Sequence, residues 1–426
     1  MAVKLTKTFI ESLKPGAKEA FYWDTEAKGF GLKISSRGRI SYLVQGRVDG
    51  SDKSARITIG THGVFTVEQA REAAREHLRT MRRGEDPREL KRQKETLELT
   101  LRQIGNDYMA RPGKLKPRSR EIIERHLSTT FEAWQHKPIA TITVRMCRTR
   151  YREILTKGLR GKKGAPGQAN QAFSVLSGLI NYASRQHRRA DGSPLIPFNP
   201  VAVLKDDRVR LRPRSRRILD HRVGACWLAL RQWRWVTYNH STLSGIDLVR
   251  FLLLTGLRIG EASTLRWDQV KLEDGFFDIP DPKNGNPVSM PLSSQATLLL
   301  GERDRERIEG NPFVFPSWSG SGHVVSPPGT MKRLGEVAGN KLAPHDLRRT
   351  YTNIGLRQCR IEKFRVDLLT NHITKDVTTE HYFDTTNLQW LQPEAQMIGD
   401  FLDREADRVA EEQCKGLNEH RLLFED

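Results

Sequence analysis

A polar, arginine-rich stretch interrupts this chain near its middle. Residues 206–217 read DDRVRLRPRSRR and include Pro213, a composition typical of a segment between domains. The whole chain has 426 residues, too many for one ordinary hydrophobic core, so roughly two to four domains are expected. We therefore interpret residues 206–217 as a basic interdomain linker.

Residues 1–90 are predicted to form a small αβ domain. Three strand-like runs, GFGLKIS, ISYLVQGRV and SARITIG, are separated by turn signals. Thr66 and Gln69 have the T-x-x-Q spacing of a capping box, and the helix that follows carries arginines, which we place on its outer face, and ends at Gly84. A three-stranded sheet with one basic helix can enter a DNA groove, although a basic helix face can also be merely solvated.

Residues 98–205 have the apolar spacing of helices. Breakers such as Pro112-Gly113 and Lys137-Pro138 separate the helical segments, and basic residues crowd their exposed positions. The segments are TLRQIGNDYMARP, RSREIIERHLSTTFEAW, VRMCRTRYREILTKGL and ANQAFSVLSGLINYASRQH. A helical bundle with a positive surface is therefore predicted.

The remainder of the chain is predicted to hold a larger core. Residues 218–396 combine helices with a strand pair around residues 271–292, and residues 397–426 are acidic and amphipathic, too few for a domain. The predicted fold class is a multidomain α+β protein. It has a small three-stranded sheet with a helix, a helical domain, a mainly α domain with a small β-sheet, and a C-terminal helix and tail.

The charge balance favours a polyanionic partner. There are 71 Lys and Arg residues against 51 Asp and Glu residues, a formal net charge of +20. Nucleic acid is the leading candidate, and the arginines of residues 206–217 suit contacts with phosphates. The alternative is a basic soluble protein with no nucleic-acid role.

The cysteines and the apolar runs exclude several other classes of protein. The four cysteines are far apart and form no CxxC pair, which argues against a zinc site and a disulfide framework. The N-terminus lacks the apolar core of a signal peptide, and no run approaches the roughly 18 apolar residues of a membrane span. A reducing cytoplasm fits, and no membrane partner is expected.

The stretch HDLRRT predicts an anion site. His345 and Arg348 are three residues apart, so on a helix they share a face, with Leu347 and Tyr351 available for packing. A histidine and an arginine on one partly buried helix face favour the binding of an anion. Arg349 points elsewhere on the helix, and we interpret it as structural or phosphate-contacting.

A second candidate arginine lies in LLLTGLRIGEASTLRW. The pattern places Arg258 at the start of a helix, where backbone N–H groups and the helix dipole favour an anion. Glu261 could brace its guanidinium. Alternatively, Arg258 and Glu261 form only a structural ion pair.

Two further segments carry candidate residues. In DIPDPKNGNPVSMPLS, Asn284-Gly285 is a β-hairpin signal, and Lys283 at its tip could reach a bound duplex or simply be solvated. In LLTNHITKDVTTEHYFDT, His372 follows an apolar segment, and Tyr382 lies ten residues later in a predicted short helix. Taken singly, such a His or Tyr is most often structural.

The order of these residues resembles the tyrosine recombinases, the phage integrase family. TGLRIGEASTLRW is similar to the family's first-arginine box, HDLRRT to its H-x-x-R box, and LLTNH followed by Tyr382 to its His-and-tyrosine box. The segments KLTKTFIESLKPG, YWDTEAKGFGLKI and ITIGTHGVFTVEQAREAA resemble the arm-binding domain of prophage and genomic-island integrases. In two departures, Asn371 stands where the family usually has glycine, and Tyr382 lies one residue further from His372 than in many members.

The resemblance implies a nucleophile and its proton-transfer partners. Tyr382 would attack the scissile phosphate and leave a 3′-phosphotyrosine and a free 5′-hydroxyl. His345 would be the proton-transfer partner, and Lys283 the acid for the departing 5′-oxygen. Tyr351 is a rival nucleophile, but its helix would hold it rigidly, whereas a nucleophile needs room to approach its target.

The remaining site residues would hold the phosphate. Arg258 and Arg348 would offer forked donors to the non-bridging oxygens, with Glu261 supporting Arg258 and His372 donating a hydrogen bond. The covalent bond would store the phosphodiester energy. The resemblance therefore implies that the reaction requires no ATP, no metal ion and no other cofactor.

The resemblance also implies partners and a division of labour. Residues 1–90 would bind arm-type DNA sites, 98–205 would be the core-binding domain, and 218–396 the catalytic domain. A homotetramer would act on double-stranded attachment sites in the cytoplasm of a bacterial host, at the nucleoid, with an excisionase and a host DNA-bending protein as candidate accessory partners. Residues 397–426 are a candidate for exchange between protomers.

Two other functions compete with a recombinase that integrates and excises a prophage or genomic island. A type IB topoisomerase uses similar chemistry, but strand relaxation has no need for an arm-like N-terminal domain. A DNA-binding protein whose catalytic site has been lost would lack some reactive residues, and here the full set is present.

Overall fold

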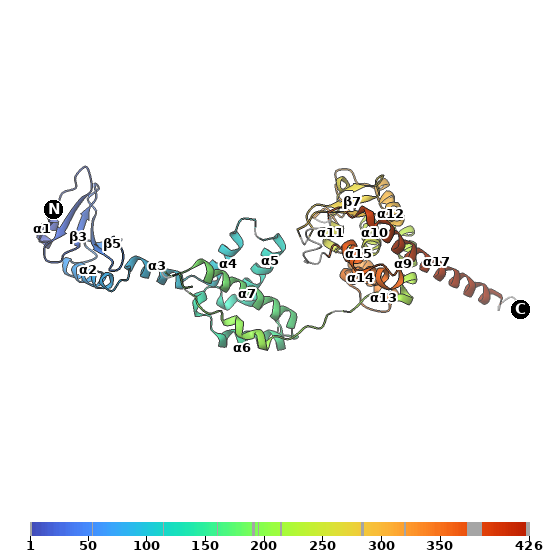
Figure 1. The fold of residues 1–426 in the computed structure, drawn as a ribbon, viewed down its shortest axis with the longest axis horizontal. Coiled ribbons are helices and arrows are strands. Elements are labelled where there is room, and N and C mark those ends of the chain that lie inside the picture. Colours follow the sequence, from blue (N-terminus) through green and yellow to red (C-terminus); the bar gives the residue numbers. More distant parts are fainter. Residues whose placement is uncertain are drawn as a thin grey trace. The chain divides into compact units, whose positions relative to one another are not determined.

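The computed structural model describes most of the chain (Figure 1). It covers residues 2–422 except for 53, 114, 160, 190–191, 195, 214, 283–284, 319–320 and 373–385. The chain divides into two compact units, Met1–Arg212 and Pro213–Asp426, and each is described by itself.

The first unit begins with a five-stranded sheet in the order β1-β2-β3-β4-β5. The three predicted strands are β3 (Phe30–Ile34), β4 (Ile40–Arg47) and β5 (Ser54–Thr61). The sheet is wider than predicted, because β2 (Ala20–Asp24) pairs antiparallel with β3, and β1 (Ala2–Val3) pairs parallel with β2. The sequence of β2, AFYWD, shows no apolar alternation, and β1 has only two residues, so neither strand has a local pattern.

Two helices accompany this sheet, α1 (Lys7–Glu11) and α2 (Val67–Arg82). Helix α2 begins with the predicted capping box of Thr66 and Gln69. The prediction that the arginines of α2 lie on its outer face is wrong for one of them, Arg71. Arg71 is only 2% exposed, and its Nε donates to Oδ2 of Asp24 at 2.9 Å while Nη2 donates to the carbonyl oxygen of Leu5 at 3.0 Å. A buried guanidinium requires such partners.

The rest of the first unit is helical and has its own hydrophobic core. Buried residues of this core include Leu127, Phe131, Phe173 and Leu176. The helices are α3 (Pro87–Leu97), α4 (Leu101–Ala110), α5 (Pro117–Arg125), α6 (Val144–Lys157), α7 (Pro166–Gln186) and α8 (Leu204–Asp207). The predicted helical character of residues 98–205 is thus confirmed.

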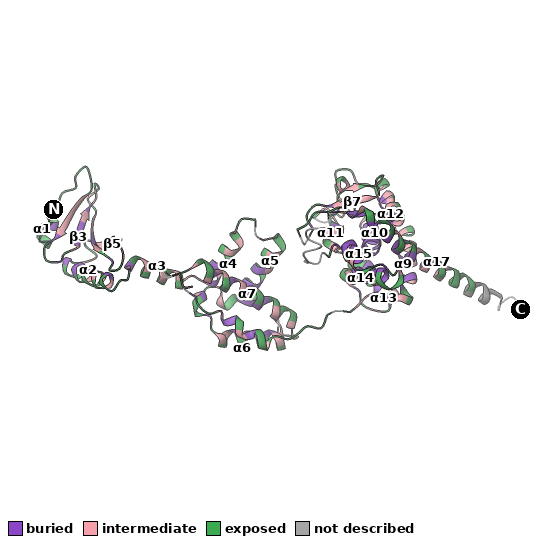
Figure 2. Cartoon of the chain, in the orientation of Figure 1, coloured by how far each residue is buried: buried purple, intermediate pink, exposed green. Residues whose placement is uncertain are grey.

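The second unit is built around α10 (His240–Thr255), whose residues 243–255 are all buried. Figure 2 shows buried residues, in purple, along α10 and the helices next to it. The other helices are α9 (Asp220–Trp235), α11 (Ile259–Ser263), α12 (Ser294–Arg305), α13 (Pro328–Ala338), α14 (Pro344–Asn353), α15 (Lys363–Leu369) and α17 (Gln392–Leu422). The predicted strand pair is present as β7 (Phe276–Ile279) and β8 (Val288–Pro291), with β6 (Val270–Lys271) as a third strand.

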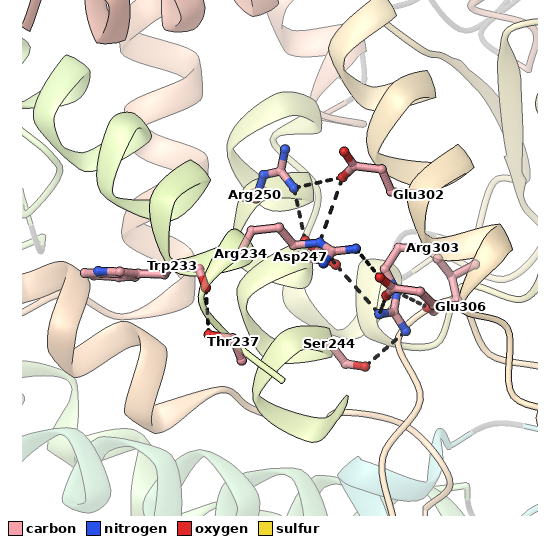
Figure 3. Close-up of polar contacts among 10 residues, drawn as sticks. Trp233, Arg234, Thr237, Ser244, Asp247, Arg250, Glu302, Arg303 and Glu306 are labelled. Carbon is pink, nitrogen blue, oxygen red and sulfur yellow. Dashed lines mark hydrogen bonds and ion pairs between the residues drawn. The ribbon is translucent and has the colours of Figure 1, made fainter. Parts of the chain in front are cut away.

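A buried ionic cluster joins α9, α10 and α12 (Figure 3). Asp247 is completely buried and lies within 3.1 Å of Arg234, 3.1 Å of Arg250 and 3.7 Å of Arg303. Glu302 pairs with Arg250, and Glu306 pairs with Arg234 and Arg303. Helix α10 ends at Thr255, just before the loop that carries Arg258. By holding α10 in place, the cluster therefore helps to position that loop.

Helix α17 contains most of the segment predicted as a C-terminal helix, but it begins at Gln392 rather than at residue 397. It packs closely on α9, where a Cβ at Gly224 would overlap the carbonyl group of Glu405, and Nε1 of Trp227 donates to Oδ1 of Asp403 at 2.7 Å. Residues 411–415 are exposed. Among the helices of the described residues, none combines the length and the apolar character that a membrane span requires.

Candidate active site

A cavity of about 440 Å³ in the second unit brings four of the predicted site residues together. They are Arg258, His345, Arg348 and His372, which come from three separate segments of the chain. The complete lining is Arg217, Arg258, His345, Arg348, Arg349, Thr352, Asn353, Leu356, Asp367, Thr370 and His372. The cavity is therefore strongly cationic.

Two predicted residues, Lys283 and Tyr382, lie outside the described part of the chain. Ile279 and Val288, which lie before and after Lys283 in the sequence, pair across β7 and β8. The segment that contains Tyr382 follows His372 at the cavity and precedes Thr386, whose carbonyl oxygen accepts a hydrogen bond from Ser289 of β8 at 2.7 Å. Both roles remain predictions.

Arg258 is held in place from two directions. It precedes α11, and the Glu261 carboxylate accepts hydrogen bonds from its backbone nitrogen at 3.2 Å and from its Nη1 at 2.9 Å. Its Nη2 also donates to the carbonyl oxygen of Asn371 at 3.4 Å. These contacts fix the guanidinium beside the residue that precedes His372.

Arg348 and His345 share the cavity face of α14. Arg348 is 8% exposed, and burial together with the nearby charge of Arg258 lowers its pKa to about 10, so it stays charged at neutral pH. Burial lowers the pKa of His345, and the positive charges of Arg349 and Arg348 lower it further. The imidazole is therefore mainly neutral at pH 7 and able to accept a proton.

The structure argues against the rival nucleophile, Tyr351. This residue is 1% exposed, and its ring packs so closely on Gly256 that a Cβ there would overlap it. Burial raises the pKa of its hydroxyl far above the ordinary value. Tyr351 is therefore a core residue that packs α14 against the end of α10.

Two residues of the site show features that sequence reasoning missed. Asn371 has φ 47°, and asparagine tolerates this left-handed conformation better than most residues. This conformation explains why asparagine can stand where the family usually has glycine. Arg217, which was predicted to belong to the linker, lines the cavity. The arginine-rich sequence around it suggested contacts with phosphates but did not indicate a position in the active site.

The arrangement of the described site residues suits a phosphate. Within the described ranges, no group of three or more His, Cys, Asp or Glu side chains is placed to hold a metal ion. Two forked guanidiniums and a neutral imidazole can instead bind an anion and move a proton.

Comparison with known proteins identifies the family. Residues 238–386, which include every predicted catalytic residue, match the phage integrase family, and residues 5–94 match the arm DNA-binding domain. The chain belongs to the phage integrase family of tyrosine recombinases. It is a member with an N-terminal arm-binding domain, as the resemblance implied.

Relatives of this integrase include two prophage integrases of Escherichia coli K12. IntZ is 23% identical over 326 residues, covering 73% of this chain and 74% of IntZ. IntF is 23% identical over 381 residues, covering 80% of this chain and 78% of IntF. The tyrosine recombinase XerA of Pyrococcus furiosus is 26% identical over 144 residues.

A solved structure supports the fold. The integrase of the transposon Tn1549, solved with a circular intermediate DNA, aligns with a TM-score of 0.51 at 16% identity, covering 67% of this chain and 95% of that one. The predicted multidomain α+β fold class is confirmed.

Proposed function

We propose that this protein is a site-specific recombinase that cuts and rejoins DNA to integrate and excise a mobile element such as a prophage or genomic island. The observation that carries the proposal is the cavity in which Arg258, His345, Arg348 and His372 meet. The family membership of the chain supports the same activity.

The arginines stabilise the charge that builds up on the transferred phosphate. Phosphoryl transfer spreads negative charge over the non-bridging oxygens, so catalysis depends on positioned donors. Arg258, braced by Glu261, and Arg348 supply forked donors to those oxygens, and His372 adds a hydrogen bond.

Tyr382 and two partners carry out the bond exchange. The Tyr382 oxygen attacks phosphorus, the bond to the 5′-oxygen breaks, and a 3′-phosphotyrosine and a 5′-hydroxyl form. His345 accepts the phenol proton, which tyrosine with a pKa of about 10 holds tightly at neutral pH, and Lys283 protonates the departing 5′-oxygen. A 5′-hydroxyl of the partner strand then reverses these steps, so neither ATP nor metal is consumed.

The other parts of the chain bind and assemble the DNA. Residues 1–90 bind arm-type sites, 98–205 bind the core site, and the basic linker of residues 206–217 lies close to phosphates. A homotetramer on two duplexes performs the exchange, with residues 397–426 passed between protomers. The protein works in the bacterial cytoplasm at the nucleoid, and an excisionase and a host DNA-bending protein assist it.

A suicide-substrate assay tests this function. The protein is incubated, without metal or ATP, with nicked duplex that carries the attachment site of its own element, and a denaturing gel reveals a covalent protein–DNA adduct. We expect wild type to form the adduct, and Tyr382→Phe to form none. Absence of an adduct from wild type that binds the site tightly would favour a DNA-binding protein. Relaxation without recombination of a supercoiled plasmid that carries the same site would favour a topoisomerase.

A further inference from the structure

Arg217 lies in the catalytic cavity although it precedes the first helix of the second unit. Its side chain lines the same cavity as Arg258 and Arg348 and is 22% exposed. Two hydrogen bonds hold the peptide group that joins Arg217 to Ile218: Nδ2 of Asn340 donates to the Arg217 carbonyl oxygen at 3.3 Å, and the backbone nitrogen of Ile218 donates to Oγ1 of Thr350, in α14, at 3.0 Å. Arg217 is thus fixed to α14.

The guanidinium of Arg217 is oriented by a carboxylate that is itself positioned. Nη1 of Arg217 donates to Oδ1 of Asp220 at 2.5 Å. Asp220 also accepts from Nδ2 of Asn353 and from Nε2 of Gln358, each at 3.1 Å. Both side-chain donors come from the α14 region, so the ion pair is anchored to the helix that carries His345.

The remaining donors of Arg217 are available to a ligand. In the described part of the chain, both of its side-chain hydrogen bonds use Nη1, to Asp220 and to the carbonyl oxygen of Ile218. Nη2 and Nε therefore make no described hydrogen bond at the cavity. An ordinary structural ion pair would explain the contact with Asp220, but it would not explain a backbone fixed at the rim of an anion site.

One scissile phosphate does not account for all four arginines that line the cavity, Arg217, Arg258, Arg348 and Arg349. A phosphodiester has two non-bridging oxygens, and in the proposed function Arg258 and Arg348 bind them. A DNA strand presents another phosphate roughly every 3.4 Å along the helix axis, and phosphate contacts of this kind set the register of the protein on DNA.

We propose that Arg217 binds the phosphodiester adjacent to the scissile one and positions the strand for attack, with Asp220 orienting its guanidinium. This inference rests on the proposed function and adds a residue that positions the substrate. It also gives the end of the linker a contact with DNA inside the catalytic cavity.

Neutral backbone linkages test the contact directly. A set of suicide substrates is made, and each carries one methylphosphonate at one of the phosphates that flank the scissile one. The rate of adduct formation is measured in a single turnover for each substrate. On ordinary DNA, Arg217→Gln should be at least about tenfold slower than wild type, because it loses a charge-assisted contact. On DNA neutral at the adjacent phosphate, wild type should fall to the rate of Arg217→Gln, and the variant should fall no further.

A control and a second variant separate this contact from folding. Arg307→Gln removes the same charge from an exposed ion pair with Asp304 at the end of α12, outside the cavity, and should keep the wild-type rate and the wild-type response to every neutral linkage. Arg217→Lys keeps the charge but loses the fork, and it should give an intermediate rate with a loss at the same linkage.

Two results would overturn the inference. The first is equal rates for Arg217→Gln and wild type on ordinary DNA. The second is an Arg217→Gln defect that persists undiminished with each flanking linkage neutralised. If wild type forms no adduct on ordinary DNA, the proposed function itself fails, an outcome distinct from either.

Discussion

Nη1 of Arg348 donates a hydrogen bond to the carbonyl oxygen of Gly256, 3.0 Å away. Gly256 ends α10 in the left-handed conformation, with φ 62°, and lies two residues before Arg258. The bond therefore joins the two arginine-bearing segments, which are far apart in sequence. The relative position of the two guanidiniums depends on this glycine.

Replacing Gly256 by alanine should disturb both the fold and the site. A left-handed conformation is unfavourable for alanine, and the new Cβ would overlap the ring of Tyr351. We expect the free energy of unfolding to fall by about 1–3 kcal/mol and adduct formation to slow, as measured by urea denaturation and the suicide substrate. Gly260→Ala is the control, because a Cβ there would meet no described heavy atom within 4 Å apart from its chain neighbours and the backbone of its own helix. Equal stability of Gly256→Ala and wild type would contradict the prediction.

Asn371 should tolerate glycine better than alanine. Its φ of 47° is left-handed, and that conformation costs an ordinary residue roughly 1–2 kcal/mol. Its carbonyl oxygen accepts a hydrogen bond from Arg258, so a shift of this backbone should reach the site. We predict that Asn371→Ala forms adduct more slowly than Asn371→Gly, a ranking that single-turnover rates at matched DNA saturation can check. The reverse ranking would show that the backbone conformation is unimportant.

Asp247 should be one of the most sensitive positions of the second unit. Its replacement by alanine would leave the buried or half-buried Arg234, Arg250 and Arg303 without their common partner. Such a loss costs about 3–5 kcal/mol, and thermal unfolding followed by circular dichroism would detect it. Asp304→Asn, which breaks only the exposed pair with Arg307, should change stability by about 0.5 kcal/mol or less. A comparable melting temperature for both variants would refute the proposed importance of the cluster.

The pH dependence of cleavage should report His345. Only the neutral imidazole accepts a proton, so the rate should rise with pH and level off through a pKa below the ordinary value of 6.5. Arg349→Gln removes a positive charge that lowers this pKa, so the rising limb should move to higher pH. Rates of adduct formation at subsaturating DNA between about pH 5 and 8 measure the shift. Arg307→Gln, which breaks an exposed pair with Asp304, should leave the midpoint in place, and an unmoved midpoint in Arg349→Gln would exclude this role.

Local patterns in the sequence predicted much of the fold. The spacing of Thr66 and Gln69 identified a helix start, because both hydrogen bonds of a capping box lie within one turn. The strand-like runs bounded by turn signals likewise identified β3, β4 and β5. By contrast, the pairing of Arg71 with Asp24, 47 residues away, depends on tertiary structure and has no local signal.

The candidate site could be predicted only in part, for the same reason. The three-residue spacing of His345 and Arg348 placed them on one face, and both line the cavity. The cavity position of Arg217 arises from contacts with Asn340 and Thr350, more than 100 residues further along the chain. Lys283 and Tyr382 were found from the order of the family's residues, and their roles stay predictions.

The attachment of residues 216–218 to α14 determines where the second unit can be separated from the first. Arg208, Arg210 and Arg212 are exposed, whereas Arg216 and Arg217 are half-buried. Trypsin cleaves after arginine unless proline follows, so it should cut after the exposed Arg208 or Arg210 before it cuts after Arg216 or Arg217. A C-terminal fragment released by such a cut keeps Arg217. A fragment that starts at Ile218 would lack the guanidinium that Arg217 contributes to the cavity.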